Sequence, residues 1–141
     1  MDRSYWDQLV RDLGEYIQDE TRDAQYYNIL AEQAPTPFAR EIILEFSRDE
    51  AQHAANFKEA YLCLTGKPYE EQPMAGPVVP EYRQALKDRT IAETNDFIKY
   101  GKQYLMAPDP YLRNLFFITG RIEAVHAMRI PLLFEEARLQ A

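Results

Sequence analysis

The chain contains an internal repeat, and this repeat limits the folds that it can form. Residues 20–57 align with residues 93–130 without a gap, and thirteen of the 38 aligned positions are identical. The identical positions include both histidines of the chain, His53 and His126, and each follows a glutamate by three residues. A repeat of this length predicts a fold that is built from two similar halves.

Each half is predicted to form two helices around a short turn that contains proline. Apolar residues recur at steps of three and four along four segments, which are residues 4–33, 37–64, 80–106 and 110–139. Thr36 and Asp109 each precede a proline and are typical helix N-caps, while Gly66 is a typical helix end. Residues 65–79 contain several prolines, so we expect a non-helical connection there.

The connection over residues 65–79 is long enough to run the length of a helix. The sequence therefore predicts an all-α protein, a four-helix bundle in which the hairpins 4–64 and 80–139 are joined by a long crossover. A chain of 141 residues can bury a core of its own, and we expect one domain over residues 1–141.

Six polar side chains interrupt the predicted apolar faces of these helices. They are Glu20, Glu50, His53, Glu93, Glu123 and His126. Unpaired carboxylates in a core are costly, so something must compensate them. Each hairpin places its two glutamates at equal distances from its turn, and the repeat can bring the two pairs together. Two divalent cations would neutralise four carboxylates, which predicts a dinuclear metal site. The alternative is a polar layer without metal.

Composition excludes several other classes of protein. The only cysteine, Cys63, cannot form an internal disulfide or supply the cysteine pairs of a rubredoxin or zinc ribbon. It lies in an apolar stretch, so we expect a buried structural thiol. The net charge of −7 is scattered and there is no basic cluster, which argues against nucleic acid as a partner. No apolar run suits a membrane or a leader segment, so we expect a cytoplasmic protein.

The six residues and their spacing resemble the diiron domain of rubrerythrins, a branch of the ferritin-like superfamily, over most of the chain. The resemblance implies a ferritin-like fold that binds two iron ions, with manganese as an alternative at the same ligands. It also implies that Glu50 and Glu123 bridge the metals and that Glu20 and Glu93 are terminal carboxylates. His53 and His126 would each bind one ion.

Four further residues correspond to, or are candidates for, positions around the metal site in rubrerythrins. Tyr27 and Tyr100 match tyrosines that hydrogen-bond carboxylates of the site in rubrerythrins, although both would also suit an aromatic core. Rubrerythrins carry an additional glutamate three residues after the third-helix ligand. Asp96 occupies that position here and Asp23 is its repeat partner. Both are candidate extra ligands, but we favour solvated or water-linked carboxylates because an aspartate is shorter.

The resemblance implies an oxidoreductase that reduces hydrogen peroxide or dioxygen, as in the response to oxidative stress. This enzyme would be a diiron peroxidase or oxidase that lacks its own rubredoxin module, so a separate electron donor is expected. Two alternatives remain open at this point. The chain could handle iron without catalysis, as a ferroxidase or iron buffer, or it could be a structural bundle that metal stabilises. A homodimer is expected only on general grounds.

Overall fold

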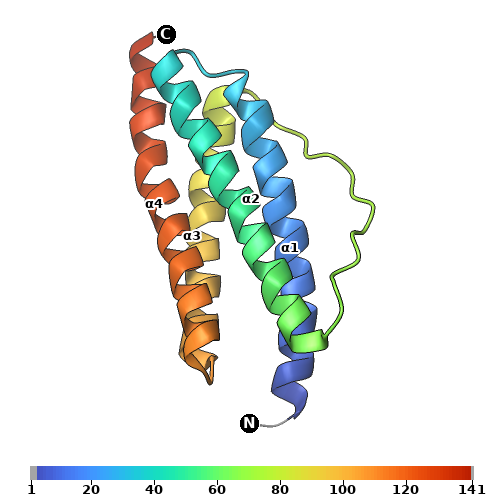
Figure 1. Cartoon of the computed structure of the whole chain (residues 1–141). Coiled ribbons are helices and arrows are strands. Elements are labelled where there is room, and N and C mark those ends of the chain that lie inside the picture. The colour runs from blue at the N-terminus through green and yellow to red at the C-terminus, as the bar shows by residue number, and fades with distance from the viewer. Residues whose placement is uncertain (1–2, 141) are drawn as a thin grey trace.

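Four long helices account for most of residues 3–140, which are the part of the chain that the computed structural model describes (Figure 1). The helices are α1 (Arg3–Ala31), α2 (Pro37–Thr65), α3 (Tyr82–Met106) and α4 (Pro110–Gln140). These bounds lie within two residues of the predicted ones, and the predicted ferritin-like helical bundle is confirmed.

Local signals in the sequence fix where α2 and α4 begin and where α2 ends. The Thr36 side chain accepts a hydrogen bond from the Ala39 backbone N–H at 3.1 Å, and Asp109 Oδ1 accepts one from the Leu112 N–H at 2.8 Å. Gly66 adopts a left-handed φ of 74° and its N–H donates to the Leu62 carbonyl, which closes α2. Only glycine adopts this backbone conformation without strain.

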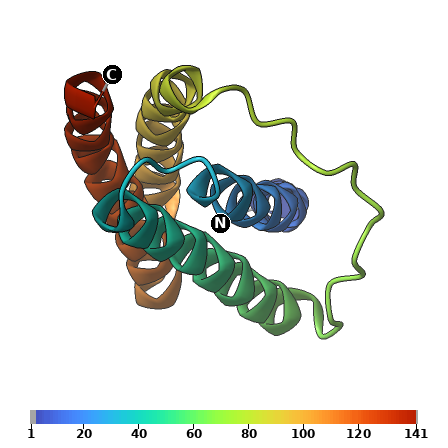
Figure 2. The same cartoon turned by 90° about the horizontal axis from the view of Figure 1, so that it is seen from above.

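The helices pack as two hairpins, α1 with α2 and α3 with α4, and between the hairpins the backbones approach chiefly at α2 and α4. The crossover runs along the outside of the bundle from the end of α2 to the start of α3, so α2 and α3 run in the same direction (Figures 1 and 2). The Tyr69 hydroxyl accepts a hydrogen bond from Gln18 Nε2 at 2.8 Å and the Tyr69 ring packs on Tyr61, which fastens the crossover to the first hairpin.

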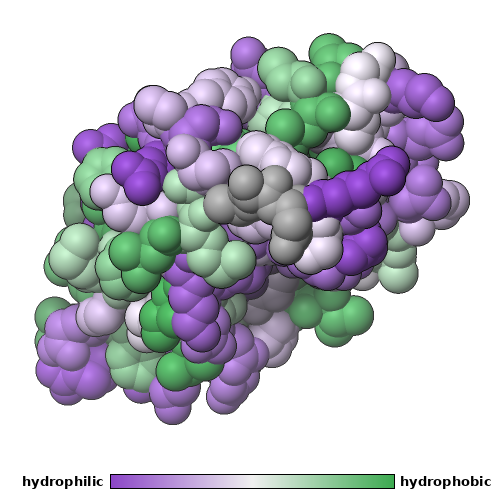
Figure 3. Space-filling view, turned by 90° about the horizontal axis from the view of Figure 1, so that it is seen from below, coloured by the Kyte–Doolittle hydropathy of each residue, from purple (hydrophilic) through white to green (hydrophobic). Residues whose placement is uncertain are grey.

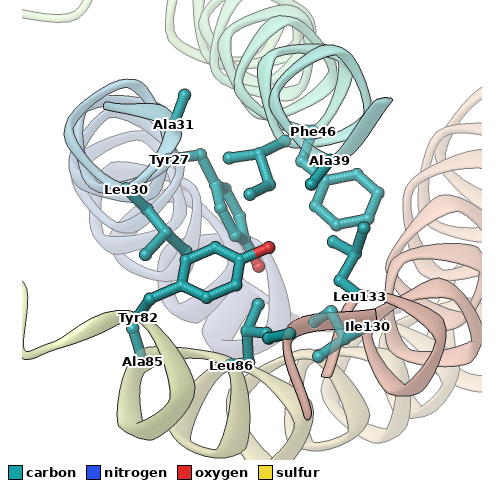
Figure 4. Packing of buried hydrophobic residues seen from close by; sticks show 12 residues of the cluster. Tyr27, Leu30, Ala31, Ala39, Phe46, Tyr82, Ala85, Leu86, Ile130 and Leu133 are labelled. Carbon is teal, nitrogen blue, oxygen red and sulfur yellow. The ribbon is translucent and has the colours of Figure 1, made fainter. Parts of the chain in front are cut away.

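Two apolar clusters fill the interior, one toward each end of the bundle. The first contains Tyr27, Leu30, Phe46, Leu86, Ile130 and Leu133, among others, and draws on all four helices (Figure 4). The second contains Leu9, Leu13, Ile17, Phe57, Tyr100, Leu112 and Phe116, among others. Along every helix the predicted ligands lie between residues of the two clusters. A polar layer is therefore enclosed by apolar packing from both ends.

Some residues of the predicted apolar faces are exposed instead, among them Leu64, Phe97 and Tyr104. Phe97 and Tyr104 are 48% and 39% exposed, and they line an apolar groove of about 230 Å³ on the outer face of α3 and α4. The buried face of α3 contains the predicted Tyr82, Leu86, Glu93 and Tyr100. It also passes through Arg89 and Gln103, so the helix is rotated slightly relative to the prediction. Cys63, which the sequence predicts to be buried, is also exposed because it lies on the outer side of the last turn of α2.

The surface is otherwise mixed in character. At the end of the bundle that carries the N-terminus, hydrophilic and hydrophobic residues are interspersed (Figure 3). Among the described residues, no helix combines the length and the apolar character that crossing a membrane requires.

Candidate metal centre

The six predicted ligands converge in the middle of the bundle, and all six are buried. α1 contributes Glu20 and α3 contributes Glu93. α2 and α4 each contribute a glutamate and a histidine one helical turn apart, so both side chains of each pair face inward. Glu20, Glu50, His53 and Glu123 offer one set of donor atoms within 4.8 Å of one another, and Glu50, Glu93, Glu123 and His126 offer a second set.

The two sets share Glu50 and Glu123, which is the arrangement that bridging carboxylates require. We call Glu20 and His53, with the shared pair, the first half-site. Glu93 and His126, with the same pair, form the second half-site. His53 Nδ1 lies 3.1 Å from Glu123 Oε1 and 3.7 Å from Glu20 Oε2.

The second half-site has the same geometry as the first. His126 Nδ1 lies 3.3 Å from Glu50 Oε1 and 3.6 Å from Glu93 Oε1. Both histidines therefore turn the same ring nitrogen, Nδ1, toward the carboxylates. The internal repeat is thus reproduced as a pseudo-twofold arrangement of donor atoms.

Eight atoms of these side chains are buried without a hydrogen-bond partner. They are both carboxylate oxygens of Glu50 and of Glu123, Oε2 of Glu20 and of Glu93, and Nδ1 of His53 and of His126. Buried polar atoms are rarely left unsatisfied, because each costs about 1–3 kcal/mol. The eight atoms match what two cations would need, with two bridging carboxylates and one oxygen and one nitrogen for each ion. The donor set therefore fits a dinuclear carboxylate and imidazole site.

The closeness of the four carboxylates shifts the pKa values of the site. Burial, reinforced by repulsion from Glu20 and other carboxylates, raises the pKa of Glu50 and of Glu123 well above the ordinary value. Burial opposes protonation of His53, but contacts with Glu123 and Glu20 outweigh it and raise the pKa of His53 to about 9. Without metal, these raised pKa values favour protons on Glu50, Glu123 and His53. Metal binding to these groups must release the protons.

The terminal glutamates are each held by a tyrosine from the opposite hairpin. The Tyr27 hydroxyl donates to Glu93 Oε1 at 2.6 Å, and the Tyr100 hydroxyl donates to Glu20 Oε1 at 2.7 Å. Both tyrosines are fully buried. Each hydrogen bond fixes one carboxylate oxygen and leaves the other, Oε2, buried without a hydrogen-bond partner. Tyr27 and Tyr100 thus also join the apolar clusters to the polar layer.

The sequence did not single out Arg89, which is 7% exposed and lies beside the second half-site. Its guanidinium donates from Nε to the Tyr27 hydroxyl at 3.0 Å and from Nη2 to Glu93 Oε1 at 3.2 Å. It also forms an ion pair with Asp23 at 3.1 Å. The position of Arg89 four residues before Glu93, on the same helical face, is the one signal that could have found it.

Asp49 is a second residue that the sequence did not single out. Its Oδ2 lies 2.8 Å from His126 Nε2, so it orients the ring and leaves Nδ1 directed at the carboxylates. Asp49 directly precedes Glu50, but its repeat partner is Ile122, so comparison of the two halves does not point to Asp49.

The two aspartates considered as extra ligands belong to neither set of donor atoms. Asp23 is engaged by Arg89, and burial, only partly offset by Arg89, raises the pKa of Asp23 to about 7. Asp96 pairs with Lys99 at 3.2 Å. Both carboxylates are therefore occupied by cationic side chains.

Comparison with known proteins agrees with this geometry. A family model described as Rubrerythrin matches residues 13–87, which is more than half of the chain. A solved structure of a hypothetical protein from Pyrococcus furiosus is 22% identical, superposes with a TM-score of 0.80, and covers 90% of this chain and 88% of its own; this likeness concerns the fold. Among curated proteins, no sequence matches this chain. The matched residues include Glu20, Glu50 and His53, and the chain belongs to the rubrerythrin family.

Proposed function

We propose that this protein is a diiron oxidoreductase that reduces hydrogen peroxide or dioxygen. The observation that carries the proposal is the set of eight unpartnered donor atoms enclosed between the two apolar clusters. A merely structural polar layer would pair these atoms with one another or with other side chains.

Iron is the proposed metal because mixed carboxylate and imidazole ligands suit Fe(II), and membership of the rubrerythrin family favours it. When bound, a ferrous pair supplies one electron from each ion and shares the charge that develops on the two oxygens of the oxidant. Manganese at the same ligands is the alternative that metal analysis would reveal.

The chain's own residues prepare the site for this chemistry. The apolar clusters exclude bulk water from both ends of the polar layer. Tyr27 and Tyr100 hold the terminal carboxylates in place, which reduces the reorganisation that the site must undergo between oxidation states. The carboxylate oxygens of Glu50 and Glu123 have no hydrogen-bond partner, so both carboxylates would be available to hold the metal ions.

The electrons must come from a separate donor. Reduction of one peroxide to two waters consumes two electrons and two protons. A ferrous pair would supply the two electrons once and the protons would come from solvent, so each further turnover needs an external reductant. The chain has a single cysteine, Cys63, and therefore no cysteine pairs for a rubredoxin-type iron site. The proposed partners are thus a small-molecule oxidant and a redox protein.

Stopped-flow mixing of the anaerobic ferrous protein with hydrogen peroxide or with air tests the proposal. We expect two irons per chain and faster oxidation by peroxide, followed through the near-ultraviolet absorption of the ferric pair. Repeated turnover with a reductant present would complete the case. The variant Glu50→Ala with Glu123→Ala is the control that should not react.

Two outcomes would replace the proposal. If air reacts as fast as peroxide and added Fe(II) is then converted to ferric mineral, the protein is an iron-handling ferroxidase. If metal binds and stabilises the fold but no oxidant is consumed with any donor, the metal is structural.

A further inference from the structure

The two half-sites have the same ligands but different surroundings. Arg89 lies four residues before the aligned repeat, and the same offset of 73 positions places Tyr16 opposite it in the first half. Among residues 3–140, the only guanidinium in contact with a predicted ligand therefore lies in the second half-site. The Tyr16 hydroxyl accepts a hydrogen bond from Gln103 Nε2 at 2.7 Å. No hydrogen bond or ion pair joins Tyr16 to Glu20.

Arg89 acts directly on a ligand of the second half-site. Its Nη2 shares Glu93 Oε1 with the Tyr27 hydroxyl, and the side chains of both Arg89 and Glu93 are almost completely shielded from solvent. A guanidinium stays charged at any ordinary pH. In a buried site it offsets the charge of Glu93 and repels a cation bound to the same carboxylate.

The other charges near the site do not produce an equivalent effect at the first half-site. Lys99 attracts Glu20 only from a distance, because its ammonium forms ion pairs with Asp96 at 3.2 Å and with Asp19 at 3.8 Å and not with Glu20. Asp49 strengthens His126 as a donor and so opposes Arg89, but its side chain is 33% exposed and is therefore screened by solvent. Asp23 shares the guanidinium but does not contact the ligands.

We propose that Arg89 makes the two metal positions unequal, so that a divalent cation fills the first half-site before the second. This inference rests on the proposed dinuclear site and adds an order of loading to it. Arg89 is a positioning residue here, because it acts through Glu93 and touches no metal itself. The first ion binds Glu20 and His53 with the shared carboxylates, and the second ion binds against the charge of Arg89.

Anaerobic titration of the metal-free protein with Co²⁺, followed by calorimetry and by cobalt absorption, tests this order. We expect two binding steps that differ in dissociation constant by about tenfold or more, which corresponds to about 1.4 kcal/mol. Glu20→Gln should remove the tighter step, and Glu93→Gln should remove the weaker one.

Arg89→Met should tighten the second step until the two steps converge. Lys87→Met is the matched control, because it removes a positive charge from the exposed side of the same helix and should leave both steps unchanged. If Arg89→Met fails to fold because Asp23 is left unpaired, Arg89→Met with Asp23→Asn removes the charge and its partner together.

Equal dissociation constants for the two Co²⁺ ions in the unaltered protein would overturn the inference. A folded Arg89 variant whose two dissociation constants still differ by the original ratio would also overturn it. These results do not bear on turnover. If Co²⁺ binds in two unequal steps but the ferrous protein reduces no oxidant, the proposed function fails and the loading order stands. If no Co²⁺ binds, both fail.

Discussion

The two half-sites of this protein present the same donor atoms in different electrostatic surroundings. In the first, Glu20 accepts a hydrogen bond from Tyr100, and His53 lies beside the carboxylates of Glu20 and Glu123. In the second, Glu93 is held by both Tyr27 and Arg89, and His126 is oriented by Asp49. The predicted ligands are therefore the same in both halves of the repeat, whereas the residues that contact them differ. A duplicated site can in this way offer two metal positions with separate properties.

The largest effect should come from the residues that the half-sites share. Glu50→Ala with Glu123→Ala removes the bridging carboxylates, so we expect metal binding to be lost in both half-sites. The gain in unfolding free energy from metal, about 2.7 kcal/mol for one site at a hundredfold excess over its dissociation constant, should vanish. Thermal unfolding with and without Co²⁺ measures this gain, and circular dichroism checks that the helices persist.

Glu41→Ala with Glu59→Ala is the matched control for this double variant, because both residues are exposed on α2. It should keep the full metal-dependent rise in melting temperature. A bridging variant that also kept this rise would show that the ligands are assigned wrongly.

A smaller effect is expected from changes that disable one half-site at a time. His53→Ala and His126→Ala each remove one imidazole and spare the bridging carboxylates, so each variant should bind one Co²⁺ instead of two. Metal content per chain, measured by mass spectrometry after dialysis, decides between the outcomes. Loss of both ions from either variant would mean that the half-sites cannot be filled independently.

The stability of the metal-free protein and the stabilisation by metal should depend on pH in opposite directions. In the metal-free protein the pKa of His53 is raised from 6.5 to about 9, so the folded state binds this proton more tightly than the unfolded state. That stabilisation is fully present below pH 6.5 and is lost as the pH rises through about 9. The raised pKa values of Glu50 and Glu123 act in the same direction.

We therefore expect the melting temperature of the metal-free protein to fall between pH 6.5 and 9, and the rise produced by Co²⁺ to grow, because fewer protons must then be displaced. Glu93, whose pKa is lowered to about 2 because neighbours led by His126 outweigh its burial, stays ionised throughout this range. Calorimetric scans at several pH values test this. A metal-free His53→Gln protein with the same pH profile would contradict the assignment.

The smallest effect should separate the two tyrosines. Tyr100→Phe removes the hydrogen bond to Glu20 Oε1, whereas Tyr27→Phe removes the hydrogen bond to Glu93 and also the acceptor of Arg89 Nε. A buried hydrogen bond contributes about 1 kcal/mol, and an unsatisfied partner costs more, so Tyr27→Phe should destabilise the metal-free protein more. Urea unfolding of both variants measures the difference. Equal losses would show that the hydrogen bond from Arg89 to Tyr27 contributes nothing to stability.

Much of the site was predictable because it depends on short-range spacing. Glu50 and His53, like Glu123 and His126, lie one helical turn apart, and any helix brings such pairs to one face. The levels of the four glutamates follow from their distances to the turns. By contrast, Asp49 contacts His126 on another helix, and Arg89 is held beside Glu93 by Tyr27, also on another helix. Both of these contacts join residues that are more than 60 positions apart in the chain, and periodicity does not reveal them.

The rotation of α3 shows the same limit on a larger scale. Phe97 and Tyr104 fit an apolar stripe with Glu93, but the structure buries Arg89 and Gln103 on that helix instead. Both alternatives place Glu93 inward, so the pattern of apolar residues did not distinguish them. Contacts with Tyr27, Asp23 and Tyr16 on α1 decide the rotation, because they satisfy the polar groups of Arg89 and Gln103.

The sequence by itself determined the four helices, their turns and the six residues that form the polar layer. It did so because caps, prolines and helical spacing act between residues that are close in the chain. Only the tertiary structure decided that Arg89 and Asp49 serve one half-site and not the other, and that Cys63 and Phe97 are exposed. These features depend on which helices pack against each other. A charged group is costly to bury, so Arg89 is buried only because residues distant in the chain pair with it.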